Sequence, residues 1–182
     1  IKVLGGAYRP DAGEIRIDGA DPHIHSPTSS SRAGVAVIYQ EFNLIPALTV
    51  RENLFLAQER STALFIHSGD EYRRARELFD RLGVTIDLQT PCRELSIAQQ
   101  QVVEIAKALA LNARIIVMDE PSATLTMNDV ERLFRVVREL KSQGVGVIYI
   151  SHRLEEIFEI VRDLNEREGG TFLLAEQNPN IA

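Results

Sequence analysis

IIVMDEPSATLT, residues 115–126, is the stretch of the sequence that decides the fold. It opens with an unbroken apolar run, which is typical of a strand buried on both faces of a parallel sheet. Asp119 and Glu120 follow, and Pro121 ends the strand because proline has no N–H to donate to a neighbouring strand. Two adjacent carboxylates are costly to desolvate unless a cation or hydrogen-bond donors meet them. The stretch therefore predicts a buried strand with a candidate site at its carboxyl end.

The chemistry that suits these two acids is that of Mg²⁺ and phosphate. An Asp at a strand end can hold Mg²⁺, usually through a coordinated water. The adjacent Glu can polarise an attacking water as a general base. The alternative interpretation is a strand-to-helix loop with solvated acids, which requires no ligand.

The rest of the chain alternates between strand and helix patterns. Further strands are expected from GEIRIDG (13–19), GVAVIYQ (34–40) and VGVIYISH (145–152), with a polar loop over residues 21–31 between the first two. Helices are expected over residues 49–57, 70–82, 96–109 and 130–140. Strands that alternate with helices predict an α/β fold with a mostly parallel sheet.

Polar residues follow three of these strands and predict a single site. Gln40, the Asp119–Glu120 pair and His152 each come at the end of an apolar run. Ligands of such sheets lie beyond the carboxyl ends of the strands, so these side chains can converge. Taken alone, Gln40 and His152 are more simply read as structural polar residues at strand ends.

A second motif is the start of the helix in ELSIAQQQVVEIAKAL, residues 94–109. Ser96 and Gln99 form a capping box, and the free N–H groups and dipole of the first turn favour an anion. Ile97 and Ala98 stand where a pair of glycines would allow a phosphate to approach most closely. The alternative is an ordinary capped core helix.

Composition excludes several classes of function. The net charge is −6 with no cluster of Lys and Arg, which argues against a nucleic-acid partner. No apolar run approaches the roughly 18 residues of a membrane span, so any membrane role would come through a partner. The single cysteine, Cys92, excludes an internal disulfide. We interpret it, with His23, His25 and His67, as a surface residue rather than a metal ligand.

These motifs, in this order, resemble the ATP-binding cassette of ABC transporters. VIYQEFNLIP (37–46) resembles the Q-loop, LSIAQQQ (95–101) the signature, IIVMDEPSATLT the Walker B and D-loop, and VIYISHRLEE (147–156) the H-loop. The residues of the signature resemble those of the first cassette of sugar importers. Thr126, at a position where most cassettes have Asp, shows the same resemblance. The resemblance runs from residue 1 to about residue 160.

The resemblance implies a fold, two cofactors and partners. The fold would be a P-loop NTPase (RecA-like) parallel sheet with helices on both faces, plus a small helical subdomain. Residues 1–50 and 101–182 would form the core, and residues 51–100 the helical subdomain that docks on the transmembrane permease. ATP and Mg²⁺ would be the cofactors and a second cassette the dimer partner. The protein would lie on the cytoplasmic face of the cell membrane.

The resemblance also implies a role for each site residue. Asp119 and Gln40 would bind Mg²⁺ through water, Glu120 would be the general base, and His152 would contact the γ-phosphate. Ser96, Ala98 and Gln99 would contact the ATP bound on the opposite cassette. The reaction would be phosphoryl transfer from ATP to water.

One expected element does not occur in the 182 residues: the phosphate-binding loop G-x-x-x-x-G-K-[ST] and its strand. In the family this loop precedes a helix that reads much like LIKVLGG, so residues 1–6 resemble the end of that helix. A remnant so short should pack only loosely. We expect a chain truncated before residue 1, and expect these residues alone not to hydrolyse ATP.

Residues 157–182 form a second helix-then-strand pattern that echoes residues 133–152. They resemble the H-loop region of branched-chain amino-acid importer cassettes. Two interpretations remain, an extra helix–strand unit or a join between two cassette sequences. Two alternative functions also remain open: an inactive binding or dimerisation module, and a soluble cassette ATPase. Such soluble ATPases often carry insertions for which residues 51–100 leave no room.

Overall fold

The computed structural model describes residues 1–56 and 68–151. Residues 1–150 belong to one compact unit. The helices of the described part are α1 (Pro27–Arg32), α2 (Val50–Phe55), α3 (Ser68–Arg81), the short 3₁₀ turn η1 (Cys92–Glu94), α4 (Ile97–Ala110) and α5 (Met127–Ser142). None of them is long and apolar enough to cross a membrane.

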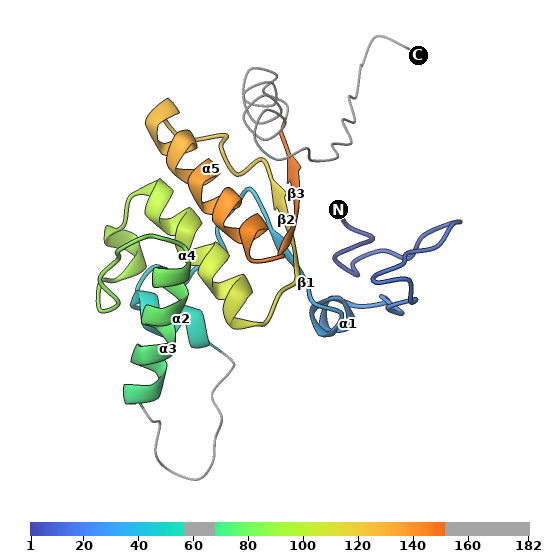
Figure 1. The fold of residues 1–182 in the computed structure, drawn as a ribbon, viewed down its shortest axis with the longest axis horizontal. Helices are drawn as coiled ribbons and strands as arrows, with labels where there is room; N and C mark the ends of the chain where they lie inside the picture. Colours follow the sequence, from blue (N-terminus) through green and yellow to red (C-terminus); the bar gives the residue numbers. More distant parts are fainter. Residues whose placement is uncertain (57–67, 152–182) are drawn as a thin grey trace. The chain divides into compact units, whose positions relative to one another are not determined.

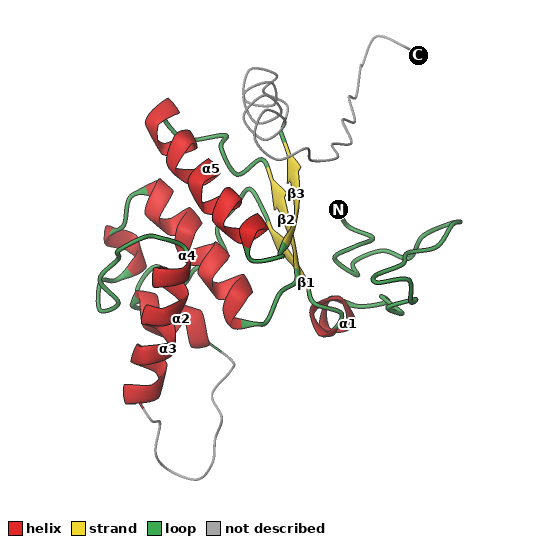
Figure 2. Ribbon diagram, in the orientation of Figure 1, coloured by secondary structure: helices red, strands yellow, loops and turns green. Residues whose placement is uncertain are grey.

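The described strands form a parallel sheet in the order β1, β2, β3 (Figure 2). β1 is Val35–Ile38, β2 is Ile115–Asp119 and β3 is Gly146–Ile150. At their carboxyl ends Ile38 pairs with Met118, and Asp119 pairs with Ile150. The predicted α/β fold class with a parallel sheet is therefore confirmed.

Helices α4 and α5 lie along one face of this sheet (Figure 1). Tyr149 pairs with Met118, so the two side chains share a face, and the ring of Phe134 from α5 lies 5.8 Å from the Tyr149 ring between centroids. Met118 and Ile116 on this face are fully buried. The apolar run that identified β2 thus supplies the centre of the core.

The helix boundaries follow the capping signals of the sequence. Thr49 caps α2 in a reciprocal box with Glu52, as predicted. On α3 the predicted apolar residues are buried, namely Ala75, Leu78, Phe79 and Leu82. Gly83 and Gly144, at φ +65° and +79°, follow α3 and α5 in the left-handed conformation that ends helices.

Two segments differ from the sequence prediction. Residues 13–19 contain no strand, because Asp18 and Gly19 have positive φ and turn the chain back within the stretch. Only an isolated antiparallel bridge between Ile17 and Ala20 results. The predicted loop over residues 21–31 contains α1, which Ser26 caps in a reciprocal box with Ser29.

The first residues pack more closely than expected. Gly5 N–H donates to the Ile1 carbonyl at 2.8 Å, and Ser30 Oγ donates to the Leu4 carbonyl at 2.7 Å. A Cβ on Gly6 would lie 2.2 Å from the Ser26 carbonyl oxygen, so only glycine fits there. The expectation of loose packing over residues 1–6 is wrong, because tertiary contacts hold a turn that would be unstable alone.

The division into a core and a helical subdomain at residues 51–100 stays a prediction. α2 and α3 fall within that range and contact each other and α4. Residues 57–67, in the middle of the range, lie outside the described residues, as do residues 157–182 with their repeated pattern.

Candidate functional site

The Asp119–Glu120 pair lies at the carboxyl end of β2, and its second member has an unusual backbone. Glu120 adopts φ +49°, in the left-handed region that side chains other than glycine seldom occupy. Its N–H donates to the Ile150 carbonyl at 2.9 Å, which ties it to the end of β3. Strained residues of this kind are concentrated at functional sites. The geometry thus independently marks Glu120 as a candidate.

Two backbone hydrogen bonds hold the turn that follows Glu120. Ala123 N–H donates to the Glu120 carbonyl at 3.2 Å, and Leu125 N–H donates to the Ser122 carbonyl at 3.0 Å. Pro121 and Ser122 are buried. Asp119 and Glu120 themselves are half-buried, so their carboxylates sit on a rigid turn within reach of solvent and ligands.

Gln40 lies at the same edge of the sheet as the two acids. It comes two residues after Ile38, whose partner Met118 directly precedes Asp119. The Gln40 side chain is exposed. Because the strands are parallel, the carboxyl ends of β1, β2 and β3 all lie at this edge of the sheet. His152 lies one residue beyond Ser151 and outside the described residues, so its position stays a prediction.

The loop after Gln40 is held by Asn53, a fully buried residue of α2. Its Oδ1 accepts from the Ile45 N–H at 2.7 Å. Its Nδ2 lies 3.0–3.2 Å from the carbonyls of Ile45, Leu48 and Thr49 and from Cys92 Sγ. No pattern in the sequence distinguishes Asn53 from its polar neighbours Arg51 and Glu52 in the short helix VRENLF.

Cys92 is free and buried beside Asn53. Burial raises the pKa of its thiol, and the hydrogen bond from Asn53 partly opposes that shift. A thiol of raised pKa is a poor nucleophile and a poor metal ligand at neutral pH. The expectation that Cys92 is a surface residue is wrong, because the residue is 1% exposed.

The start of α4 carries the capping box predicted from the sequence. Ser96 Oγ accepts from the Gln99 N–H at 3.3 Å, and Gln99 Oε1 accepts from the Ser96 N–H at 3.0 Å. Ser96 and Gln99 are exposed, Ala98 is half-buried, and Ile97 is 44% exposed. This helix start belongs to a different element from the strand-end acids and presents its first turn to the surface.

Two charged residues near the middle of α4 contact the loop after Gln40. Lys107 Nζ donates to the Asn43 carbonyl at 2.9 Å. The carboxylate of Glu104, which is 6% exposed, lies near the Asn43 backbone. Burial raises the pKa of Glu104, while Lys107 and the Asn43 N–H partly oppose that shift. Neither residue can be singled out from the sequence, since both look like ordinary polar positions on an amphipathic helix.

The strand-end residues fit a magnesium nucleotide in their donor chemistry. Asp119 and Gln40 offer oxygen donors, which Mg²⁺ prefers, at one edge of the sheet. No group of three or more His, Cys, Asp or Glu side chains that could hold a metal ion occurs among residues 1–56 and 68–151. A Mg²⁺ ion there would therefore keep water and phosphate oxygens as its other ligands, which is its usual behaviour.

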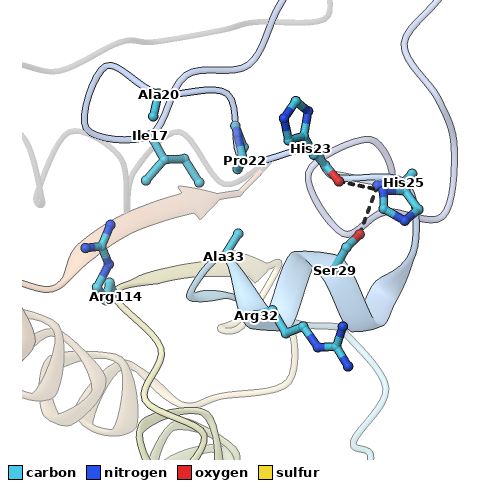
Figure 3. A pocket seen from close by; sticks show the side chains of 9 residues that line it. All are labelled: Ile17, Ala20, Pro22, His23, His25, Ser29, Arg32, Ala33 and Arg114. Atoms are coloured by element: carbon cyan, nitrogen blue, oxygen red, sulfur yellow. Dashed lines mark hydrogen bonds between the residues drawn. The ribbon is translucent and has the colours of Figure 1, made fainter.

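A cavity of about 370 Å³ lies at the other end of the sheet. Its wall includes Arg114, which directly precedes β2, whereas Asp119 is the last residue of β2 and Glu120 follows it. Figure 3 shows His23 and His25 at its rim, and both are exposed, as expected of surface residues. His25 Nδ1 lies 2.6 Å from the carbonyl of His23, and His23 Nδ1 lies 3.2 Å from an Asp21 carboxylate oxygen. The cavity is separate from the strand-end site.

Comparison with known proteins finds a matching family and similar import ATP-binding proteins. The family described as ABC transporter matches residues 1–123. The ribose import ATP-binding protein RbsA 1 of Rubrobacter xylanophilus is 51% identical over 160 residues, covering 88% of this chain and 32% of that protein. The ribose import ATP-binding protein RbsA of Hahella chejuensis is 53% identical over 161 residues, with the same two coverages. The chain thus spans about a third of the length of these relatives.

Solved structures of similar fold are ATP-binding cassettes. The ADP conformation of MJ1267, an ATP-binding cassette of an ABC transporter, superposes with a TM-score of 0.75 at 25% identity, covering 87% of this chain and 66% of that one. The dimeric post-hydrolysis state of the cassette MJ0796, bound to ADP and Pi, gives a TM-score of 0.66 at 25% identity, covering 85% and 69%.

Proposed function

The chain belongs to the ABC transporter family, and from that premise we propose that it is part of the ATP-hydrolysing subunit of a sugar importer. The observation that carries the proposal is Glu120, held in a left-handed conformation next to Asp119 at the sheet edge that Gln40 shares. The identity of about half with two ribose import ATP-binding proteins supports a sugar, and ribose first, as the cargo.

The reaction that these residues would serve is phosphoryl transfer from ATP to water. Bound Mg²⁺ would supply charge neutralisation at the phosphates. Asp119 and Gln40 would hold the ion through water, and Glu120 would accept the proton of the attacking water. His152 would contact the γ-phosphate. The fixed turn from Glu120 to Leu125 supports this assignment, because catalysis of this reaction depends mainly on positioning.

Two kinds of partner follow from the same proposal. Ser96, Ala98 and Gln99 would contact the ATP bound on a second cassette, and the surface position of the first turn of α4 supports this. Residues 51–100 would dock on the transmembrane permease. The protein would then be held peripherally at the cytoplasmic face of the membrane through that contact.

A transport assay with a chimeric importer tests the function. The matched 160 residues would replace the corresponding segment of the Rubrobacter xylanophilus ribose import ATP-binding protein, and ribose uptake and ATPase activity would be measured. We expect activity, and Glu120→Gln should lower ATP turnover about 10²- to 10⁴-fold, the usual contribution of a general base. Glu131→Gln, at an exposed position of α5, is the matched control. A folded, assembled chimera without ATPase activity would contradict the proposal.

The polypeptide of 182 residues alone should not hydrolyse ATP. It contains no G-x-x-x-x-G-K-[ST] loop, and loss of even one preorganised donor to developing charge costs about 3–4 kcal/mol in an enzyme. Mg²⁺-dependent release of phosphate that Glu120→Gln removes would refute this prediction.

The same missing pattern favours one second candidate, a module that dimerises or docks without turning over nucleotide. Titration calorimetry of the 182-residue polypeptide with Mg²⁺ and ATP separates the two. Binding that Asp119→Asn weakens would support the nucleotide site, whereas docking on a permease without any nucleotide binding would support the module.

A further inference from the structure

The cavity near the start of β2 differs in chemistry from the strand-end site. Its volume of about 370 Å³ lies in the range of small-molecule pockets. Ile17, Ala20, Pro22 and Ala33 give its wall an apolar surface, and none of the described residues that line it is acidic. In a chain of net charge −6, a cavity lined by arginine and histidine without an acid favours an anionic ligand.

Long-range contacts hold one wall of the cavity in place. The turn from Ile17 to Ala20 closes on itself through an isolated antiparallel bridge. Asp18, within this turn, pairs with Arg114, which is 96 residues away in the sequence. The Arg114 side chain also packs against the backbone of Gly34, where a Cβ would lie 3.3 Å from Arg114 Cγ. This wall is therefore formed before any ligand binds, as is usual for small-molecule sites.

Helix α1 and the residues before it form the opposite wall (Figure 3). Ser29 Oγ accepts from the N–H groups of His25 and Ser26 at 2.9 Å each, and it donates to the Ser26 carbonyl at 2.9 Å. His25 Nδ1 lies 2.6 Å from the His23 carbonyl, so this ring nitrogen is the donor. These bonds use the polar atoms of the wall internally, with the exception of the guanidinium of Arg32.

Arg32 is the charged group best suited to bind an anion. The charge of Arg114 is already balanced by Asp18, whereas Arg32 has no hydrogen bond or ion pair with any residue in the described part of the chain. The Arg32 side chain is exposed in the last turn of α1, at the rim of the cavity. A guanidinium donates two parallel hydrogen bonds to a carboxylate, which gives geometric specificity as well as charge.

We propose that this cavity binds a small organic carboxylate, with its aliphatic or aromatic body against Ile17, Pro22 and Ala33 and its carboxylate on Arg32. The apolar wall favours a ligand with an apolar body over a bare inorganic anion, because only the former removes apolar surface from water. The site is separate from the strand-end acids, so the inference goes beyond the proposed function and does not depend on it.

Titration of the 182-residue polypeptide with sodium benzoate, followed by amide chemical shifts in NMR, tests the site. Benzyl alcohol is the neutral probe of similar shape, and inorganic phosphate is the anion without an apolar body. We expect saturable shifts in residues 17–33 and in Arg114, with benzoate bound about fivefold more tightly than benzyl alcohol, the value of an exposed charge pair. Phosphate should bind more weakly than benzoate, and added salt should weaken benzoate binding by screening.

Three variants assign the binding to named groups. Arg32→Met should lower the affinity for benzoate about fivefold and leave that for benzyl alcohol unchanged. Ala33→Leu should abolish binding of both, because the larger side chain fills the cavity. Arg135→Met is the matched control, since Arg135 is exposed on α5 and is not part of the cavity wall, and it should bind benzoate like the natural sequence. The amide spectrum of each variant shows that it is folded.

Several results would overturn the inference. Equal affinity for benzoate and benzyl alcohol, or benzoate binding unchanged in Arg32→Met, would contradict an anion held by Arg32. Phosphate binding as tight as benzoate binding would contradict a role for the apolar wall. Saturable shifts that persist in a folded Ala33→Leu variant, or none with the natural sequence up to about 50 mM benzoate, would contradict the site itself. No measurement uses ATP, so each result leaves the proposed function untouched.

Discussion

Asn53 is fully buried on α2, and its amide contacts backbone groups from Ile45 to Thr49. Such a residue is costly to bury and is kept because each of its polar atoms has partners. Glu104 is the opposite case, since one of its oxygens lacks a partner. At the scale of single residues, the loop after Gln40 is therefore held by the buried amide of Asn53 and by Lys107.

Replacement of Asn53 by Leu should lower the free energy of unfolding by about 1–3 kcal/mol, since it removes the acceptor of the Ile45 N–H and the amide hydrogen bonds to the carbonyls of Ile45, Leu48 and Thr49. Denaturant unfolding monitored by circular dichroism measures the change. The same substitution at exposed Asn128 should change stability by less than about 0.5 kcal/mol. A loss for Asn53→Leu no larger than for Asn128→Leu would show that the loop does not depend on this amide.

Glu104 predicts a dependence of stability on pH. Its pKa in the folded protein is raised by burial, so the folded state binds this proton more tightly than the unfolded state. Its contribution to stability is then full below the ordinary carboxyl pKa and is lost as pH rises through the folded value. Glu104 faces Lys107 and lies near Cys92, whose thiol pKa is raised by burial, so the comparison stays at acidic to neutral pH, where that thiol remains protonated.

We therefore expect the unfolding free energy of Glu104→Gln, relative to the natural sequence, to increase between pH 4 and pH 7. Urea titrations at several pH values provide the measurement, with Glu131→Gln as the exposed control. A relative stability that is flat or decreasing over this range would contradict a raised pKa at Glu104.

At the scale of elements, α5 shows how a capping residue connects the site to the core. Thr126 Oγ1 accepts from the Asp129 N–H at 3.3 Å and donates to Asp129 Oδ2 at 2.7 Å. The helix that follows buries Val130, Leu133 and Leu140. Thr and Asp both cap helices well, which accounts for Thr126 at a position where most cassettes have Asp.

Thr126→Ala should cost about 1 kcal/mol of stability, because the first turn of α5 loses its cap. Thr126→Ser keeps the hydroxyl and should retain most of that contribution. Thr124→Ala, on the exposed turn before the cap, is the control. Thermal unfolding of the three variants compares their stabilities, and Thr126→Ala should have the lowest midpoint. Equal midpoints for Thr126→Ala and Thr124→Ala would exclude a capping role.

At the scale of the whole molecule, α4 is the element that joins the others. It contacts β1, α2, α3 and α5. A second connection runs between the ends of α3 and α5, where Gln143 Oε1 accepts from Arg81 Nε at 3.0 Å and from a terminal guanidinium nitrogen of Arg81 at 2.8 Å. Gln143 Nε2 also donates to the Arg81 carbonyl at 2.8 Å. The helix expected to belong to the helical subdomain is thus tied to a helix of the core.

A double-mutant cycle tests this tie. Arg81→Met and Gln143→Ala should each have a small effect, with a coupling energy of about 0.5–1 kcal/mol, because the contact is bidentate but exposed. Arg76→Met, on an exposed position of the same helix, should be additive with Gln143→Ala. Additivity in the Arg81 cycle would mean that the contact does not hold α3 and α5 together in solution.

The sequence by itself determined the parallel α/β fold, the positions of β1, β2 and β3, and the caps of α2 and α4. These depend on periodicity and on local hydrogen bonds, which short stretches of sequence encode. The Asp119–Glu120 pair could also be identified from the sequence, because two acids after a buried apolar run conflict with burial unless they have a role. The strand predicted over residues 13–19 is wrong because an alternation of apolar and polar residues does not reveal a tight turn at Asp18.

Only the tertiary structure decided the left-handed conformation of Glu120, the hydrogen bonds of Asn53, and the hydrogen bond of Lys107 to Asn43. Glu120 and Lys107 depend on groups far apart in the chain: Glu120 bonds to Ile150, and Asn43 and Lys107 are 64 residues apart. The partners of Asn53 lie nearby in the sequence, but burial of the amide depends on how α2 packs. No local pattern carries such information, because a side chain's partners are set by which elements pack against it. The sequence names the residues able to do the chemistry, and packing determines which of them are held in place to do it.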